Sequence, residues 1–216
     1  LVHAHSLGLN PQSWNGIFLS HLHPDNCSDV NVLLDGMKEP FIVAEEHCVL
    51  PMDKLKVKSK GKFKWYPVVS YYHQNLAKHL FPVKHKDHIK ISGLEVGAFK
   101  SEHYDPTVGF MIAHPKIKIG YPADGPYYKG QEKYYDGCDV IILNILVPKG
   151  KKPLEHKHMS IDEAILLVNR MENKPKLIIM QHFSFWMMRS NIWKQAKILK
   201  DATKVKVIHA EDFMEV

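Results

Sequence analysis

Short runs of apolar and β-branched residues recur along the chain and predict strands. They cover residues 16–20, 40–45, 88–93, 107–113, 116–121, 139–145, 176–180 and 204–209. Runs of roughly four to eight such residues, bounded by turn-forming residues, are typical of strands. Several are apolar at every position, which indicates strands that are buried on both faces.

Segments with helical periodicity lie between these strands. They cover residues 28–37, 160–171 and 191–202. Ser28 is the predicted N-cap of the first, and Ser160 with Glu163 forms the S-x-x-E pattern of a capping box in the second. The apolar face of the second comprises Ile161, Ala164, Ile165, Val168 and Met171. The alternation predicts a mixed α and β fold in which helices cover strands.

One segment, at residues 53–65, has lysine at every second position. The lysines are Lys54, Lys56, Lys58, Lys60, Lys62 and Lys64. Period 2 places them on one face of an extended chain, and the central KSKGK favours a turn, so we expect a lysine-rich hairpin or loop. Such lysines protect a solvated edge strand from unwanted pairing, or they bind the phosphates of a polyanion.

Composition narrows the class of protein. The 216 residues are enough for one sizeable core or two small ones, and no apolar run has the roughly 20 residues of a membrane-spanning helix. The net charge of +6 favours anionic partners, and a homo-oligomer stays open. The three cysteines are scattered and form no C-x-x-C pair, which favours the reducing cytoplasm. The 15 histidines raise the expectation of metal chemistry.

The segment HLHPDN directly follows the first apolar run and contains His21, His23 and Asp25. Loops that follow a buried strand commonly carry the residues of a site. Imidazoles and a carboxylate suit zinc, manganese or iron. Alone, the cluster is also compatible with a polar surface loop.

Further candidate ligands occur at later strand ends. His103 lies before the strand at 107–113, Asp124 lies in a turn after 116–121, and His182 follows 176–180. In series, the segments HLHPDN, EHYDPTVGF, GYPADGPYY and IMQHFS resemble the motifs of the metallo-β-lactamase-fold hydrolases, in particular their phosphodiesterase-like and uncharacterised archaeal members. The resemblance implies an αββα sandwich formed by one domain over residues 1–216.

The resemblance also implies roles for individual residues. His21, His23 and His103 would hold a first metal ion, while Asp25 and His182 would help to hold a second. Asp124 would bridge the two ions, which are expected to be zinc, with manganese or iron as alternatives. The residues implied to act in catalysis are Asp25 and His158. Tyr71, Tyr72 and His73 are expected substrate contacts, because their segment lies between two motif blocks.

The chain departs from the family pattern in two places. Asn26 stands where the family has a histidine ligand of the second metal, and an amide oxygen is a poorer zinc ligand than imidazole. The N-terminal strands of the family do not precede LVHAHSLGL, so we expect an incomplete first sheet.

The expected function is hydrolysis of a phosphodiester through a metal-bound hydroxide. The substrate would be a small molecule or a nucleic acid, and no membrane partner is expected. The alternatives are an ester, thioester or lactam hydrolase on the same fold, and a binding protein in which Asn26 impairs catalysis.

Overall fold

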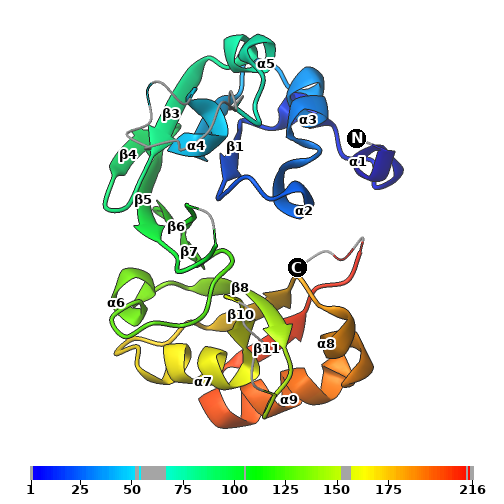
Figure 1. Ribbon diagram of the computed structural model, residues 1–216, viewed down its shortest axis with the longest axis vertical. Coiled ribbons are helices and arrows are strands. Elements are labelled where there is room, and N and C mark those ends of the chain that lie inside the picture. Colours follow the sequence, from blue (N-terminus) through cyan, green and yellow to red (C-terminus); the bar gives the residue numbers. More distant parts are fainter. Residues whose placement is uncertain are drawn as a thin grey trace, which may run out of the picture. The chain divides into compact units, whose positions relative to one another are not determined.

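The computed structural model describes residues 2–51, 54, 67–104, 106–151, 157–212 and 214. The chain forms two compact units, Leu1–Lys84 and His85–Val216 (Figure 1). The expected lysine-rich hairpin at 53–65 lies outside the described residues except for the exposed Lys54, so it stays a prediction.

The first unit contains a parallel sheet of three strands in the order β1-β2-β3. The strands are β1 (Gly16–Leu19), β2 (Phe41–Glu45) and β3 (His79–Val83). The helices in the described part of this unit are short: α1 (Val2–Ser6), the 3-10 helix η1 (Pro11–Ser13), α2 (Pro24–Cys27), α3 (Val30–Gly36), α4 (Glu46–Val49) and α5 (Tyr71–Leu76). The central strand β2 is buried at every position, and Leu34 of α3 and Cys48 of α4 pack in the same core. The sheet therefore holds the loops that follow β1 and β2 at one common edge.

The second unit contains a mixed sheet in the order β11-β10-β8-β7-β6-β5-β4, with β9 paired to β8. Its antiparallel part comprises β4 (His88–Ile91), β5 (Leu94–Lys100), β6 (Val108–His114) and β7 (Ile117–Tyr121). Its parallel part continues from β7 through β8 (Val140–Val147), β10 (Leu177–Gln181) and β11 (Lys206–His209), with β9 (Met159–Ser160) beside the end of β8. The helices are α6 (Glu132–Tyr135), α7 (Ile161–Asn169), α8 (Phe185–Arg189) and α9 (Ile192–Thr203).

The parallel strands of the second unit explain where its polar loops gather. The chain returns from β8 to β10 through α7, and from β10 to β11 through α8 and α9 (Figure 1). The apolar faces of these helices pack with β8 and β10 in the main core of the unit. Because the strands run in the same direction, the segments that follow β7, β8 and β10 leave the sheet at the same edge.

All eight predicted strands are present, and the mixed fold class is confirmed. The prediction missed β3, β5 and the short β9. The predicted helix at 28–37 starts later, at Val30, and Ser28 is not its N-cap. Pro24 at the first helical position starts the separate helix α2, which ends at Cys27 with Ser28 as its C-cap, and the Ser28 hydroxyl donates to the Pro24 carbonyl.

The capping box of α7 is confirmed, because Ser160 and Glu163 each bond the other's backbone. Leu167 is fully buried on the core side of α7, whereas Ile165 is only partly buried. Within the described ranges, no helix is both long and apolar enough to span a membrane.

Candidate metal centre

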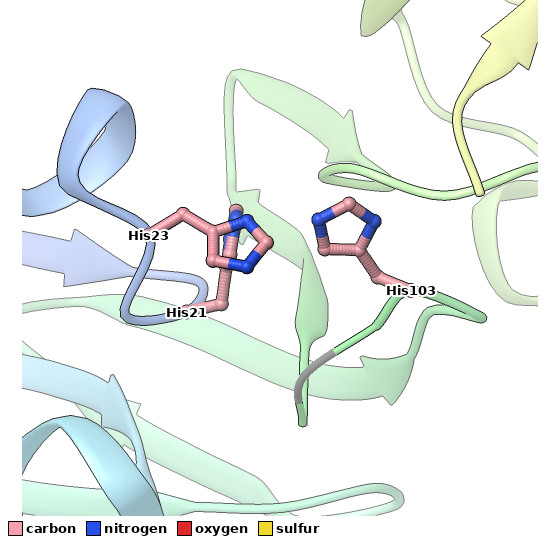
Figure 2. Close-up of side chains that lie close together, drawn as sticks. All are labelled: His21, His23 and His103. Carbon is pink, nitrogen blue, oxygen red and sulfur yellow. The ribbon is translucent and has the colours of Figure 1, made fainter. Parts of the chain in front are cut away.

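The first pair of candidate ligands lies at the carboxyl end of β1. The apolar strand ends at Leu19, and the next residues, Ser20 and His21, are buried. His21 Nδ1 lies 3.0 Å from the Ser20 hydroxyl oxygen. The His21 and His23 rings meet edge to face, with centroids 4.8 Å apart (Figure 2). The fixed Nδ1 leaves Nε2 as the His21 nitrogen suited to ligate a metal.

Asp25 and Asn26 follow on α2, for which His23 is the N-cap residue. Both side chains line a hollow of about 320 Å³ in the first unit, together with residues of β1. One short helical turn therefore carries the predicted carboxylate ligand and the amide that replaces a histidine.

In the second unit, His103 lies on the loop after β5 (Figure 2). Its side chain is buried, and its Nδ1 lies 2.8 Å from the carbonyl oxygen of Lys157. The Lys157 ammonium in turn donates to the His103 carbonyl over 3.2 Å. A ring nitrogen facing a carbonyl must carry the proton, so His103 Nε2 has the lone pair that a metal requires.

Asp124 lies on the loop after β7 and is 1% exposed. Its Oδ1 accepts a hydrogen bond of 2.7 Å from Asn144, and its Oδ2 lies 3.3 Å from Nε2 of His182. The loop is tightly shaped, since Ala123 has a φ of 61° and Gly125 a φ of 145°. The Ser101 hydroxyl also donates to the Asp124 carbonyl over 2.5 Å. Backbone and side chain of Asp124 are thus both fixed.

His182 directly follows β10 and adopts the left-handed conformation, with a φ of 60°. His158 precedes β9, which pairs with the end of β8. The His158 ring centroid lies 4.8 Å from that of His103 and 6.3 Å from that of His182. The second unit therefore brings together four predicted site residues, His103, Asp124, His158 and His182, from four separate segments.

The chemistry of these donors fits divalent metal ions. The ligand candidates are imidazoles and carboxylates, which suit zinc, manganese and iron. His103 has one ring nitrogen fixed by an oxygen atom while the other is suited to ligation, which is the arrangement usual for metal-binding histidines.

The three cysteines lie outside the candidate ligand groups of the described residues. Cys27, Cys48 and Cys138 are buried and form no disulfide. Burial raises the pKa of the Cys27 thiol, and it raises the pKa of Cys138 to about 12. Burial also raises the pKa of the Cys48 thiol. Without a bound metal, all three thiols therefore stay protonated at neutral pH. The candidate ligand groups among the described residues contain histidine and glutamate and no cysteine.

A second group of candidate ligands, Glu45, Glu46 and His47, follows β2. The buried Glu45 carboxylate accepts hydrogen bonds of 2.8 Å from both the backbone N–H and Nδ1 of His47. Burial raises the pKa of Glu45, although the bonds to His47 oppose the shift. These bonds start α4, so the pair has a clear structural task as an N-cap.

The expected substrate contacts lie on and beside α5. Tyr71 and Tyr72 are exposed. Nδ1 of His73 lies 2.6 Å from the Ser70 hydroxyl, and its Nε2 lies 3.2 Å from Asp35. His73 therefore stabilises the start of α5, and a role of the three residues in binding substrate stays a prediction.

The sequence interpretation missed two site residues, Asn144 and Gln181. Asn144 is the only polar residue of the apolar strand β8, and it bonds Asp124. Gln181 is the last residue of β10, opposite Asn144 in the parallel ladder. A single amide inside an apolar strand was the available signal, because such a group must find a partner in the core.

Comparison with known proteins places the chain in a family. The Beta-lactamase superfamily domain matches residues 3–183. The uncharacterized protein MJ1374 of Methanocaldococcus jannaschii is 26% identical over 211 residues, which are 97% of this chain and 76% of that protein.

Solved structures share the fold at low identity. The metallo-beta-lactamase fold protein YhfI from Bacillus subtilis is 15% identical with a TM-score of 0.71, over 94% of this chain and 77% of that chain. The short form of human tRNase Z is 18% identical with a TM-score of 0.66, over 98% of this chain and 82% of that chain. The motifs, their placement at strand ends and these matches lead to one conclusion: the chain belongs to the metallo-β-lactamase-fold hydrolase superfamily.

Proposed function

We propose that this protein is a metal-dependent hydrolase that cleaves phosphodiesters. The observation that carries the proposal is the cluster of His103, Asp124, His158 and His182 in the second unit, in which His103 and Asp124 are buried and the other two are partly buried. There, Asp124 and His182 are 3.3 Å apart and the rings of His103 and His158 are 4.8 Å apart. Such a concentration of oriented imidazoles and a buried carboxylate is expensive to maintain in a core unless it has a task.

The proposed ligands divide into two sets. His21, His23 and His103 would hold one divalent ion, preferably zinc. Asp25 and His182 would help to hold a second, and Asp124 would bridge the two. Bound ions of this kind activate water and polarise a phosphoryl oxygen. Within the second unit, the chain holds the His103 ring and the Asp124 carboxylate in fixed orientations.

His158 is proposed as the proton donor to the leaving oxygen. Its ring lies beside His103 and near His182, so it is positioned among the proposed ligands. An imidazole changes its protonation state near neutral pH, which suits an acid that must donate and recover a proton.

Two observations support a phosphodiester over other substrates. The net charge of +6 favours an anionic substrate, and the lysine-rich segment 53–65 adds to that preference. One relative of the same fold is a tRNase, human tRNase Z. We include nucleic acid among the proposed substrates on these grounds, and we propose a cytoplasmic location from the free, buried cysteines.

The test is a substrate panel with the zinc- and manganese-loaded protein. Bis-p-nitrophenyl phosphate and a short RNA should be hydrolysed, and His158→Ala should lower the rate roughly 100-fold or more. The panel also contains an ester, a thioester and a cephalosporin, which test the alternative hydrolase activities. Turnover of one of these with none of the phosphodiesters would overturn the proposal.

Asn26 favours a second candidate function, that of a metal-binding protein without hydrolytic activity. A neutral amide gives the second ion one ligand fewer than an imidazole would. Firm binding of one ion without turnover of any member of the panel would support this candidate.

A further inference from the structure

Asn144 is an unusual residue for its place in the fold. It lies in the middle of β8, between β7 and β10, and its side chain is 2% exposed. Its neighbours along the strand, Leu143 and Ile145, are fully buried. An amide in such a position destabilises the fold unless it is fully hydrogen-bonded. Asn144 therefore needs polar side chains as hydrogen-bond partners.

Those partners form a directed chain of hydrogen bonds. Nε2 of Gln181 donates to Oδ1 of Asn144 over 2.9 Å. Nδ2 of Asn144 donates to Oδ1 of Asp124 over 2.7 Å, and lies 3.2 Å from the hydroxyl of Tyr121. The amide of Asn144 therefore transmits the orientation of Gln181 to the carboxylate of Asp124.

The orientation of the Asn144 amide is set by charge. Asp124 accepts hydrogen bonds only, so the amino group of Asn144 must face it and the amide oxygen must face away. Gln181 then presents its own amino group to that oxygen. The parallel register pairs Gln181 directly with Asn144, so the two side chains are held at the same level of the sheet.

β10 consequently controls both oxygens of Asp124. Gln181 acts on Oδ1 through Asn144, while the next residue, His182, lies 3.3 Å from Oδ2. A hydrogen bond to a carboxylate from a neutral amide stabilises its charge without adding a competing one. An acidic residue at 144 would instead place two carboxylates within about 3 Å, where both cannot ionise.

We propose that Asn144 and Gln181 are positioning residues that reserve Oδ1 of Asp124 for the protein and leave Oδ2 as its single ligating oxygen. This inference rests on the proposed metal-binding function. It makes Asp124 a one-oxygen ligand whose direction is fixed before any ion arrives.

The test uses Asn144→Leu, which keeps the branched shape of the side chain and removes the donor, and Gln181→Met, which removes the donor one step further away. The apo-protein is titrated with zinc against a chelator and, separately, with Co²⁺ while the visible absorption spectrum is recorded. We expect zinc affinity to fall about 10–100-fold in Asn144→Leu, and less in Gln181→Met. The Co²⁺ spectrum should change in both, because the freed carboxylate can turn.

Asn173→Leu is the matched control. Nδ2 of Asn173 donates to Asp136 over 2.9 Å in the same amide-to-carboxylate arrangement, but on the surface of the same unit. This variant should keep both the zinc affinity and the Co²⁺ spectrum of the parent.

The outcomes separate the two proposals. A parent protein that binds no metal contradicts the proposed function. A parent that binds metal, together with a folded Asn144→Leu or Gln181→Met of unchanged affinity and spectrum, contradicts the positioning role alone. Gln181 is only half-buried, so its variant provides the answer if Asn144→Leu does not fold.

Discussion

The two units hold their candidate ligands in different ways. In the first, His21 and His23 are two residues apart on one loop, and His21 has a local bond to Ser20. In the second, Asp124 is fixed by Asn144 of β8 and by His182 just after β10, both distant in sequence, and His103 by the carbonyl of Lys157. The first unit therefore relies on local sequence, whereas the second builds its ligand geometry into the core of the sheet.

Removing one ligand from each unit tests this difference with the largest expected effect. His23→Ala and Asp124→Ala should each lower metal affinity more than about 100-fold, since a lost ligand weakens binding at least as much as a lost supporting contact. Only Asp124→Ala should also destabilise the apo-protein, by about 1–3 kcal/mol, because it leaves the buried Asn144 donor without its carboxylate. Chelator competition gives the affinities and apo-protein denaturation gives the stabilities.

Equal losses of apo-protein stability in the two variants would contradict the comparison. It would mean that the loop of the first unit is as strongly integrated into its core as the Asp124 network.

Asn26→His tests whether the first unit lacks one ligand for the second ion. An imidazole would supply a nitrogen ligand where the amide supplies at best a weak oxygen, so the second ion should bind about 10–100-fold more tightly. Phosphodiester hydrolysis should rise with it. Native mass spectrometry of the parent and the variant measures the metal-to-protein ratio.

Val32→His is the control for this substitution. Val32 is half exposed on α3, so the change adds an imidazole to the same unit at another place. Two ions per chain in the parent, unchanged in Asn26→His, would show that another group already completes the site.

Gly109→Ala probes how tightly the second unit is packed behind its ligand loop. A Cβ at Gly109 would lie 2.3 Å from the Tyr135 hydroxyl and 2.6 Å from the backbone oxygen of Tyr121, just before the Asp124 loop. Backbone cannot move aside cheaply, so we expect a loss of about 1–3 kcal/mol in the free energy of unfolding. Chemical denaturation measures it, and Gly130→Ala, where nothing crowds the Cβ but φ is 97°, shows what backbone strain alone contributes.

If Gly109→Ala lowers the free energy of unfolding no more than Gly130→Ala does, the backbone before the Asp124 loop moves easily to accommodate the Cβ. The rigid support that we assign to the second unit would then be wrong.

Glu45→Gln should give the smallest effect, and it tests the Glu45–His47 pair of the first unit. Burial raises the pKa of Glu45 in the folded protein above its unfolded value, so its favourable contribution is present at low pH and is lost as pH rises through the folded pKa. Glutamine keeps an acceptor for the His47 backbone and does not ionise. The variant should therefore gain stability relative to the parent as pH rises.

Denaturation curves across the acid to neutral range provide the measurement. A stability difference that is constant with pH, or that grows in favour of the parent, would mean that the bonds to His47 outweigh the burial of Glu45.

The sequence predicted the parts of the fold that depend on local pattern. The eight strands were recognisable from their short runs of apolar and β-branched residues, and the capping box of α7 because Ser160 and Glu163 act within one turn. β5 was missed because Gly97 and two charged residues interrupt its apolar pattern. The prediction of Ser28 as an N-cap was wrong because Pro24, four residues earlier, starts a separate helix.

The candidate site was predicted as a set of residues and not as a geometry. His103, Asp124 and His182 were found at strand ends, but which atom of each is available depends on partners far along the chain. Asn144 and Gln181 are 37 residues apart, and only the register of β8 with β10 places them together. The convergence of the ligands of the two units stays a prediction.

The backbone at His182 also limits which ions this scaffold could be adapted to bind. A φ of 60° is tolerated chiefly by glycine, asparagine, aspartate and histidine. Three of these four carry a nitrogen or oxygen donor. Exchange of His182 for Asp or Asn, which would shift preference towards harder ions, is therefore open without remodelling the turn. A change to cysteine for softer ions would meet conformational strain at this φ, so the turn favours an oxygen or nitrogen donor at the position.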